Sequence, residues 1–271
     1  MDRQRVEELM ERVERSEKEV LLKPQGELKC GVDLGTAYIV IVVLDKDDNP
    51  IACEKQAANV LRDGVVVDYT GALKIVKSLK EKLEQRLGVE LYKCAIAMPS
   101  GTEGSVKTHQ YVAEGAGFEV TNVLDEPSCA NAIYKIDDGV IVDIGGGTTG
   151  LAILNGGKVV QTEDEPTGGT HLSLVLAGNY GISFEEAEKI KQDYKRHNEI
   201  LPVVRPVAQK MASIVKKYID PSNTDTIYLC GGTSCLTGIE GIIEKETGIH
   251  TVKPKNPFLV TPTGIAMNCL L

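Results

Sequence analysis

The chain has 271 residues, of which 42% are hydrophobic and 25% charged, and its formal net charge is −9. This length and composition suit one large globular domain or two small ones, and the acidic balance argues against binding nucleic acid through its phosphates. The lack of tryptophan and the aromatic share of 4% also argue against a base-stacking surface.

Residues 1–22 are predicted to form a charged amphipathic helix with apolar positions at Val6, Leu9, Met10, Val13, Val20 and Leu21. Such a stripe packs on its own chain or on a neighbouring subunit; the alternative is a detachable helix that docks on a larger assembly. Pro24 and Gly26 end the element. The charged start lacks a signal-peptide core, and no apolar run approaches the ~20 residues of a membrane span, so we expect a cytoplasmic protein.

Strands and helices alternate along the following hundred residues. The patterns predict a strand, turn and strand over 28–44, a helix over 70–87, a strand over 93–98, a helix near 104–116, a strand near 119–124 and a helix over 126–134. Alternation with short links is typical of an α/β fold in which helices cover a central sheet.

The most informative feature is an internal repeat. Residues 31–43 and 141–153 share one pattern, in which an apolar strand ends in aspartate, a glycine-bearing turn follows, and an apolar strand leaves. Asp143 follows Asp33 by 110 residues, about the length of one small domain. We therefore predict two similar halves that face one another across a cleft.

The two turns have the composition of a phosphate site. A phosphate chain needs backbone N–H groups that can approach closely, hydroxyl donors and a divalent cation. Asp33 and Asp143, each at a strand end, can hold Mg²⁺ through its waters. Taken singly, each aspartate could be a turn former and the glycines a flexible turn. The candidate phosphate-binding residues are Gly35, Thr36, Gly145, Gly146, Gly147, Thr148 and Thr149.

A third segment, 226–243, has the pattern of a strand, a Gly-Gly turn and a helix that begins with hydroxyl residues. Gly231, Gly232 and Thr233 leave room there for a flat ring or a sugar near the positive end of a helix dipole. The sequence contains neither a G-x-x-x-x-G-K-[ST] loop nor a strand-linked G-x-G-x-x-G.

In this order the segments resemble the five motifs of the actin, heat-shock-chaperone and sugar-kinase superfamily. The segments 96–100 and 125–127 look most like the chaperone branch, and the compact chain is most similar to the chaperone-like proteins of bacterial ethanolamine operons. The two phosphate motifs match 31–43 and 140–154, the adenosine motif matches 227–243, and the two connecting helices match 125–134 and 261–268.

The resemblance implies an actin-like ATPase fold, in which duplicated ribonuclease H-like domains with mixed sheets and flanking helices enclose a nucleotide cleft. It implies ATP or ADP with Mg²⁺ as the ligand, and Asp33 and Asp143 as catalytic and metal-holding groups. The implied organisation is an N-terminal helix at 1–27, a first domain at 28–138 plus 258–271, and a second domain with a small inserted lobe at 139–257.

Further roles carry over from the superfamily by position. Glu126 would orient or deprotonate the water that attacks ATP; alternatively, it only complements the dipole of its helix. Glu188 and Lys191 share a helix face and match a pair that clasps ribose and adenine, with an ordinary surface ion pair as the alternative. Gly168 and Gly169 match a further phosphate-side turn.

Two departures from the superfamily pattern affect the expected rate of ATP hydrolysis more than the expected binding of nucleotide. Gly150 stands where the heat-shock chaperones usually carry an aspartate. The segment between Asp33 and the 93–98 strand is too short for their full upper lobe, which supplies a phosphate-contacting lysine. Lys74 and Lys77 are expected to be exposed and match no such lysine.

The cysteines and histidines predict no metal centre. None of the cysteines forms a C-x-x-C pair, so buried free thiols are expected, and the four histidines lie far apart. Activators of dehydratases share the superfamily fold and hold an iron–sulfur cluster, but Cys129 alone makes a poor cluster site. The seven cysteines are Cys30, Cys53, Cys94, Cys129, Cys230, Cys235 and Cys269.

The first functional hypothesis is a slow ATPase whose cleft closes on nucleotide and controls a protein partner, either an ethanolamine-pathway enzyme or a microcompartment component. The alternative is a scaffold or filament protein that binds ATP without hydrolysing it. A small-molecule kinase is disfavoured because about 70 residues between the second phosphate and adenosine motifs leave little room for a substrate lobe.

Overall fold

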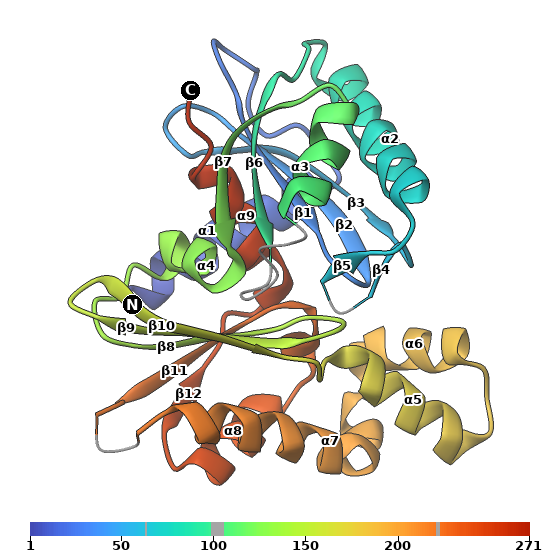
Figure 1. The fold of residues 1–271 in the computed structure, drawn as a ribbon, viewed down its shortest axis with the longest axis vertical. Coiled ribbons are helices and arrows are strands. Elements are labelled where there is room, and N and C mark those ends of the chain that lie inside the picture. Colours follow the sequence, from blue (N-terminus) through green and yellow to red (C-terminus); the bar gives the residue numbers. More distant parts are fainter. Residues whose placement is uncertain (63, 99–105, 221–222) are drawn as a thin grey trace.

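The computed structural model describes residues 1–62, 64–98, 106–220 and 223–271. Its framework is a pair of five-stranded sheets, one above the other in Figure 1. The first sheet, in the order β3-β2-β1-β6-β7, contains β1 (Lys29–Leu34), β2 (Tyr38–Leu44), β3 (Pro50–Ala57), β6 (Lys93–Met98) and β7 (Glu119–Asp125). The second, in the order β10-β9-β8-β11-β12, contains β8 (Gly139–Ile144), β9 (Thr149–Asn155), β10 (Lys158–Glu165), β11 (Thr226–Cys230) and β12 (His250–Val252).

The two sheets have the same topology. In each, three antiparallel strands form a meander, and two more strands extend the sheet in parallel from the first of them. Asp33 pairs with Val40 near the end of β1, and Asp143 pairs with Gly150 near the end of β8. The duplication predicted from the internal repeat is therefore confirmed.

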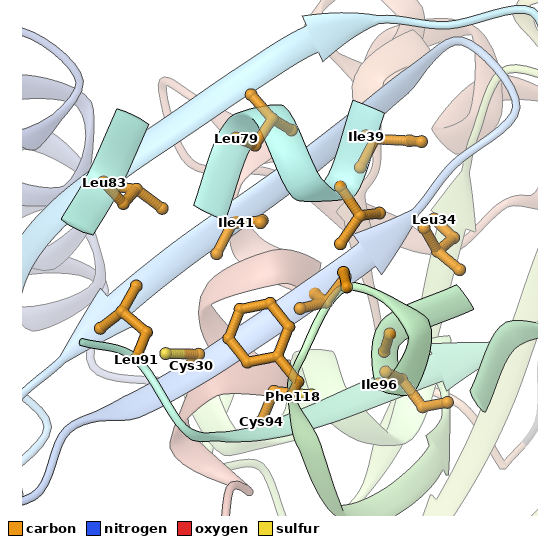
Figure 2. Close-up of a cluster of buried hydrophobic side chains, with 14 of the residues drawn as sticks. Cys30, Leu34, Ile39, Ile41, Leu79, Leu83, Leu91, Cys94, Ile96 and Phe118 are labelled. Atoms are coloured by element: carbon orange, nitrogen blue, oxygen red, sulfur yellow. The ribbon is translucent and has the colours of Figure 1, made fainter. Parts of the chain in front are cut away.

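Helices α2 (Tyr69–Leu87) and α3 (Val106–Gly115) cover one face of the first sheet, as Figure 1 shows. The Asp68 side chain accepts a hydrogen bond from the Gly71 N–H at the start of α2. Leu79 and Leu83 of this helix belong to one buried cluster with Ile39 and Ile41 of β2 (Figure 2). This apolar layer fixes the β1–β2 hairpin that carries Asp33. A short pair, β4 (Leu61–Arg62) and β5 (Val65–Val66), precedes α2.

Helices α4 (Glu126–Tyr134) and α9 (Val260–Met267) lie between the two sheets (Figure 1). Asp125 caps α4 by accepting a hydrogen bond from the Ser128 N–H. The helices touch backbone to backbone, because a Cβ on Gly264 would lie 2.0 Å from the Cys129 carbonyl oxygen. A second glycine-mediated contact joins α9 to the first sheet, where a Cβ on Gly31 would lie 2.4 Å from the Ala266 nitrogen. The two halves are thus connected through tightly packed helices.

The helices of the second half are α5 (Gly169–Tyr180), α6 (Phe184–Gln192), α7 (His197–Tyr218) and α8 (Ile239–Thr247). Short 3₁₀ turns precede α7, α8 and α9, in that order: η2 (Tyr194–Arg196), η3 (Gly232–Cys235) and η4 (Pro257–Leu259). Helix α7 packs its apolar residues, among them Val204, Ala208 and Met211, into the core beneath the second sheet. Helices α5 and α6 contact each other beside this core (Figure 1).

Two sequence-based boundaries differ from the structure. The predicted helix over 1–22 is α1 (Arg3–Ser16), because the chain turns after Ser16 and Leu21 donates a backbone hydrogen bond to Ile51. The predicted helix after the Gly-Gly turn begins instead as η3, and α8 starts only at Ile239. Within the helix expected near 104–116, residues 104 and 105 lie outside the described residues, as do Pro99 and Ser100.

Helix α1 packs on its own chain. Val6, Met10 and Val13 are buried in a cluster that includes Leu44 and Cys53 of the first sheet. The structure therefore agrees with the interpretation in which the helix packs on its own chain. No helix in the four described stretches is long and apolar enough to cross a membrane.

Candidate nucleotide cleft

A cavity of about 320 Å³ lies between the two β-hairpins. The first hairpin contributes Asp33, Gly35 and Thr36 to its wall. The α6 helix, the Gly231 turn and the start of α4 complete it. Of the residues predicted from the sequence, the cavity brings together Asp33, Gly35, Thr36, Glu126, Asp143, Gly145, Gly146, Gly147, Thr148, Glu188, Lys191, Gly231, Gly232 and Thr233.

The second hairpin is a tight turn whose glycines have close neighbours. The Gly145 N–H donates to the Thr148 carbonyl oxygen at 3.0 Å. A Cβ on Gly146 would lie 3.0 Å from Cβ of Ala37, so the two hairpins face each other at close range. An alanine at position 146 would require Ala37 to shift by a few tenths of an ångström.

Thr149, Gly168 and Gly169 do not line the cavity. The buried Thr149 hydroxyl donates to the Thr167 carbonyl oxygen at 2.6 Å, and the Gly169 N–H donates to the Gly145 carbonyl oxygen at 3.0 Å. A Cβ on Gly168 would lie 2.6 Å from the Gly146 carbonyl oxygen. These three residues contact the second hairpin or the segment that follows it, outside the cavity wall.

Three carboxyl groups, those of Asp33, Glu126 and Asp143, line the cavity and interact with one another. Burial, followed by the charge of Asp143, raises the pKa of Asp33 to about 7. Burial also raises the pKa of Asp143, although the Thr261 hydroxyl donates to its Oδ2 at 2.5 Å and opposes the shift. The pKa of Glu126 is raised well above its ordinary value by burial and then by Asp143 and Asp33. Because the carboxyl groups repel one another when ionised, a positive charge among them would be stabilising.

The donor set fits a hydrated divalent cation. Among the described residues, no three or more His, Cys, Asp or Glu side chains are arranged to hold a metal ion directly. Asp33 and Asp143 do line one cavity, and Mg²⁺ usually keeps several of its waters while it contacts one or two carboxylates and the substrate phosphates. The two aspartates are therefore the groups that would hold Mg²⁺, which would supply charge neutralisation at the phosphates.

Asp33→Asn is expected to stabilise the ligand-free protein at pH 8 by about 1 to 3 kcal/mol, allowing for screening by water in the cleft. The ordinary pKa of the group is 3.8 and its folded value about 7, so between these values only the unfolded chain has lost the proton. The wild-type protein then loses stability as pH rises through this range, and the variant loses less, because of the three carboxyl groups only Asp143 and Glu126 still carry raised pKa values. Urea unfolding in Mg²⁺-free buffer at pH 4 and pH 8 measures the difference.

Asp47→Asn, on the exposed turn between β2 and β3, is the matched control for Asp33→Asn and should leave the urea midpoint unchanged at both pH values. Equal stability of wild type and Asp33→Asn at pH 8 would contradict the view that the ionised Asp33 carboxylate destabilises the ligand-free protein.

On the opposite wall, Glu188 and Lys191 form a half-buried ion pair of 2.7 Å. Burial would raise the pKa of Glu188, but the Lys191 charge and hydrogen bonds from Lys191, Ser173 and Gln192 outweigh it and lower the pKa. Burial lowers the pKa of Lys191, whose ammonium also donates to the Gly169 carbonyl oxygen at 3.0 Å. The Lys191 side chain is 13% exposed and the Glu188 side chain 24%, so the pair is not an exposed surface ion pair.

The turn at Gly231 lies between this wall of the cavity and the Asp143 carboxyl group. Gly231 has a φ of 86°, and a Cβ there would lie 2.2 Å from Oδ1 of Asp143. The Thr233 hydroxyl donates to the Gly145 carbonyl oxygen at 2.7 Å. The predicted adenosine segment and the second phosphate hairpin are thus one connected unit.

Several residues of the cavity wall were not predicted. The Tyr38 hydroxyl donates to Oε1 of Gln192 at 3.1 Å and so joins β2 to α6 across the opening. The Phe258 ring lies edge-on to Tyr38, with centroids 5.6 Å apart. Lys55 is a first-sheet lysine that reaches the cavity, but it pairs with Glu17 at 2.8 Å and lies 5.3 Å from the Phe258 centroid. Strand alternation in 38–44 could have suggested Tyr38; no local pattern indicates Phe258.

Comparison with known proteins gives matches over most of the chain. Residues 106–263 match the family model described as Type IV pilus assembly protein PilM. Ethanolamine utilization protein EutJ of Escherichia coli K12 is 41% identical over 243 residues, which cover 89% of this chain and 86% of that protein. The crystal structure of EutJ from Carboxydothermus hydrogenoformans is 46% identical, with a TM-score of 0.92 over 98% of this chain and 99% of that one.

A more distant structure shares only the fold. MreB 5 of Spiroplasma citri bound to AMPPNP is 20% identical, with a TM-score of 0.70 over 89% of this chain and 95% of that one. The sequence-based resemblance to chaperone-like ethanolamine-operon proteins and the actin-like ATPase fold are confirmed by these similarities.

Proposed function

Because the chain belongs to the EutJ family of ethanolamine utilization proteins, and to the broader family that the PilM model describes, we propose that its cleft binds ATP. Slow hydrolysis, coupled to closure of the cleft, then controls a protein partner of ethanolamine utilisation. The observation that supports the proposal is that one cavity is lined by both hairpins, by the carboxyl groups and by the Glu188–Lys191 pair.

Each wall suits a different part of the nucleotide. The backbone of Gly145 to Gly147 and the hydroxyls of Thr36 and Thr148 face the space that the phosphates would occupy, with the carboxyl groups alongside. Gly231 and Gly232 leave a flat surface for the adenine, and Lys191 with Glu188 offers donors and acceptors to the ribose. The AMPPNP in the MreB 5 structure supports a nucleotide in this fold.

Closure is proposed to turn on α4 and α9, because these helices connect the halves and α4 carries Glu126 at its first position. The hydrogen bond between Tyr38 and Gln192 spans the opening and would favour the closed form. The partner would be an ethanolamine-pathway enzyme or a microcompartment component that binds one form better than the other. A cytoplasmic location, with association with a microcompartment, follows from this role.

ATP with Mg²⁺ is expected to raise the melting temperature of the wild-type protein by about 5 to 10 °C at a hundred times its dissociation constant, because it binds only the folded state. Lys191→Met keeps the apolar stem but removes the ammonium, and should lose most of this shift. Differential scanning fluorimetry with ATP, ADP and buffer alone measures both. No shift at millimolar ATP would contradict nucleotide binding by the cleft.

A further inference from the structure

Strand register aligns two aspartates on one face of the second sheet. Asp143 of β8 pairs with Gly150 of β9, and Gly150 pairs in turn with Asp164 of β10. Directly opposite residues in an antiparallel ladder project from the same face. Because Gly150 has no side chain, the residue between the two aspartates on this ladder places no side chain between their carboxyl groups.

The carboxyl group of Asp164 lies beside the position that a side chain at residue 150 would occupy. A Cβ on Gly150 would lie 3.1 Å from Oδ1 of Asp164 and 3.7 Å from Cγ of Pro127. The same face therefore meets the first turn of α4, and the Asp164 charge helps to raise the pKa of Glu126. A side chain from the neighbouring strand thus reaches the position that a residue 150 side chain would fill.

We propose that Asp164 is a positioning residue of the cleft, whose carboxylate orders the waters of the Mg²⁺–nucleotide beside Glu126. This inference rests on the proposed nucleotide function and adds a residue that the sequence motifs do not include. The sequence departs from the superfamily at Gly150, and the ladder supplies a carboxylate at the same place from β10.

A purely structural role for Asp164 is the competing explanation. From β10, its carboxylate lies beside the first turn of α4, where a negative charge complements the helix dipole. The two roles differ in their dependence on Mg²⁺. Loss of a dipole partner lowers stability equally with and without the ion, whereas loss of a group that orders its waters weakens the response to the ion itself.

Asp164→Asn is expected to raise by about 10-fold the Mg²⁺ concentration that gives half of the thermal shift at fixed ATP. The melting temperature without Mg²⁺ should change little. Glu163→Gln is the matched control, because it removes the same charge from the adjacent position of β10, whose side chain projects from the other face. The probe is a titration of Mg²⁺ followed by scanning fluorimetry, with no turnover required.

Relocation of the carboxylate provides the second variant. In Gly150→Asp combined with Asp164→Gly, removal of the Asp164 side chain clears the contact at 3.1 Å, so the new aspartate can fill the same space. The double variant should recover most of the Mg²⁺ response, which a structural role would not predict. An unchanged Mg²⁺ midpoint in Asp164→Asn, with a normal wild-type response, overturns the inference alone. A wild-type protein that ignores both ATP and Mg²⁺ overturns the proposed function and the inference with it.

Discussion

Glu126→Gln is expected to lower the single-turnover rate of ATP hydrolysis by about 10² to 10⁴-fold while the thermal shift with ATP is retained. The variant keeps the shape and hydrogen-bonding capacity of the side chain but cannot accept a proton from water. Glu126 is the first residue of α4, lines the cavity, and is half-buried close to Asp33 and Asp143.

The pH dependence of turnover gives a second readout for the same residue. Burial and neighbouring carboxyls raise the pKa of Glu126, so at acidic pH the group holds its proton and cannot act as a base. Turnover by the wild-type protein should therefore rise with pH until the carboxyl is ionised, and the residual rate of Glu126→Gln should lack this rise. A cation held by Asp33 and Asp143 would shift the rise to lower pH, because its charge favours the ionised form.

Glu185→Gln tests whether loss of any glutamate from the first turn of a helix would lower ATP turnover as Glu126→Gln does. Glu185 lies in the first turn of α6, as Glu126 does in α4, but it is exposed and outside the cavity. We expect its loss to leave phosphate release unchanged. Turnover in Glu126→Gln equal to that of wild type would refute the catalytic role. A wild-type protein that binds ATP but releases no phosphate would favour the non-hydrolysing scaffold, and sedimentation with and without ATP would then show whether it polymerises.

The hairpins were predictable because their signals are local. An apolar β-branched run that ends in aspartate and is followed by glycine specifies a strand and a tight turn within a dozen residues. Since the pattern occurs twice, the sequence also predicted that Asp33 and Asp143 would meet, and both line the cavity. The i,i+3 spacing of Glu188 and Lys191 predicted their contact, which is 2.7 Å in the structure.

Other features depend on distant contacts and had no local signal. The apolar residues Val20 and Leu21 continue the period of α1, but the helix ends at Ser16 because Leu21 pairs with Ile51 of β3. The approach of Asp164 to Gly150 depends on a register shift between Val159 and Gln161 of β10, and a bulge of this kind changes which side chains share a face. Residues in the cleft wall such as Phe258 come from a 3₁₀ turn that only tertiary packing places there.

Gly264→Ala is expected to destabilise the protein by about 3 kcal/mol or more, at the upper end for overpacking, and to lower its melting temperature by about 6 to 12 °C. The added methyl would lie 2.0 Å from the carbonyl oxygen of Cys129 and 2.6 Å from its carbonyl carbon. Both are backbone atoms of α4, so no side chain can rotate away and the two helices must separate. Thermal unfolding of the purified variant measures the loss.

Gly178→Ala separates this packing effect from the general effect of glycine in a helix. Gly178 lies within α5, and a Cβ there would have no neighbour within 4 Å, so alanine should stabilise the protein by about 0.5 to 1 kcal/mol. Opposite signs for the two substitutions would locate the sensitivity in the contact between α4 and α9. Because α4 also carries Glu126, Gly264→Ala should reduce phosphate release further than its folded fraction explains. A variant that melts within about 2 °C of wild type would show that the helices can move apart at little cost, and closure of the cleft would then need a hinge elsewhere.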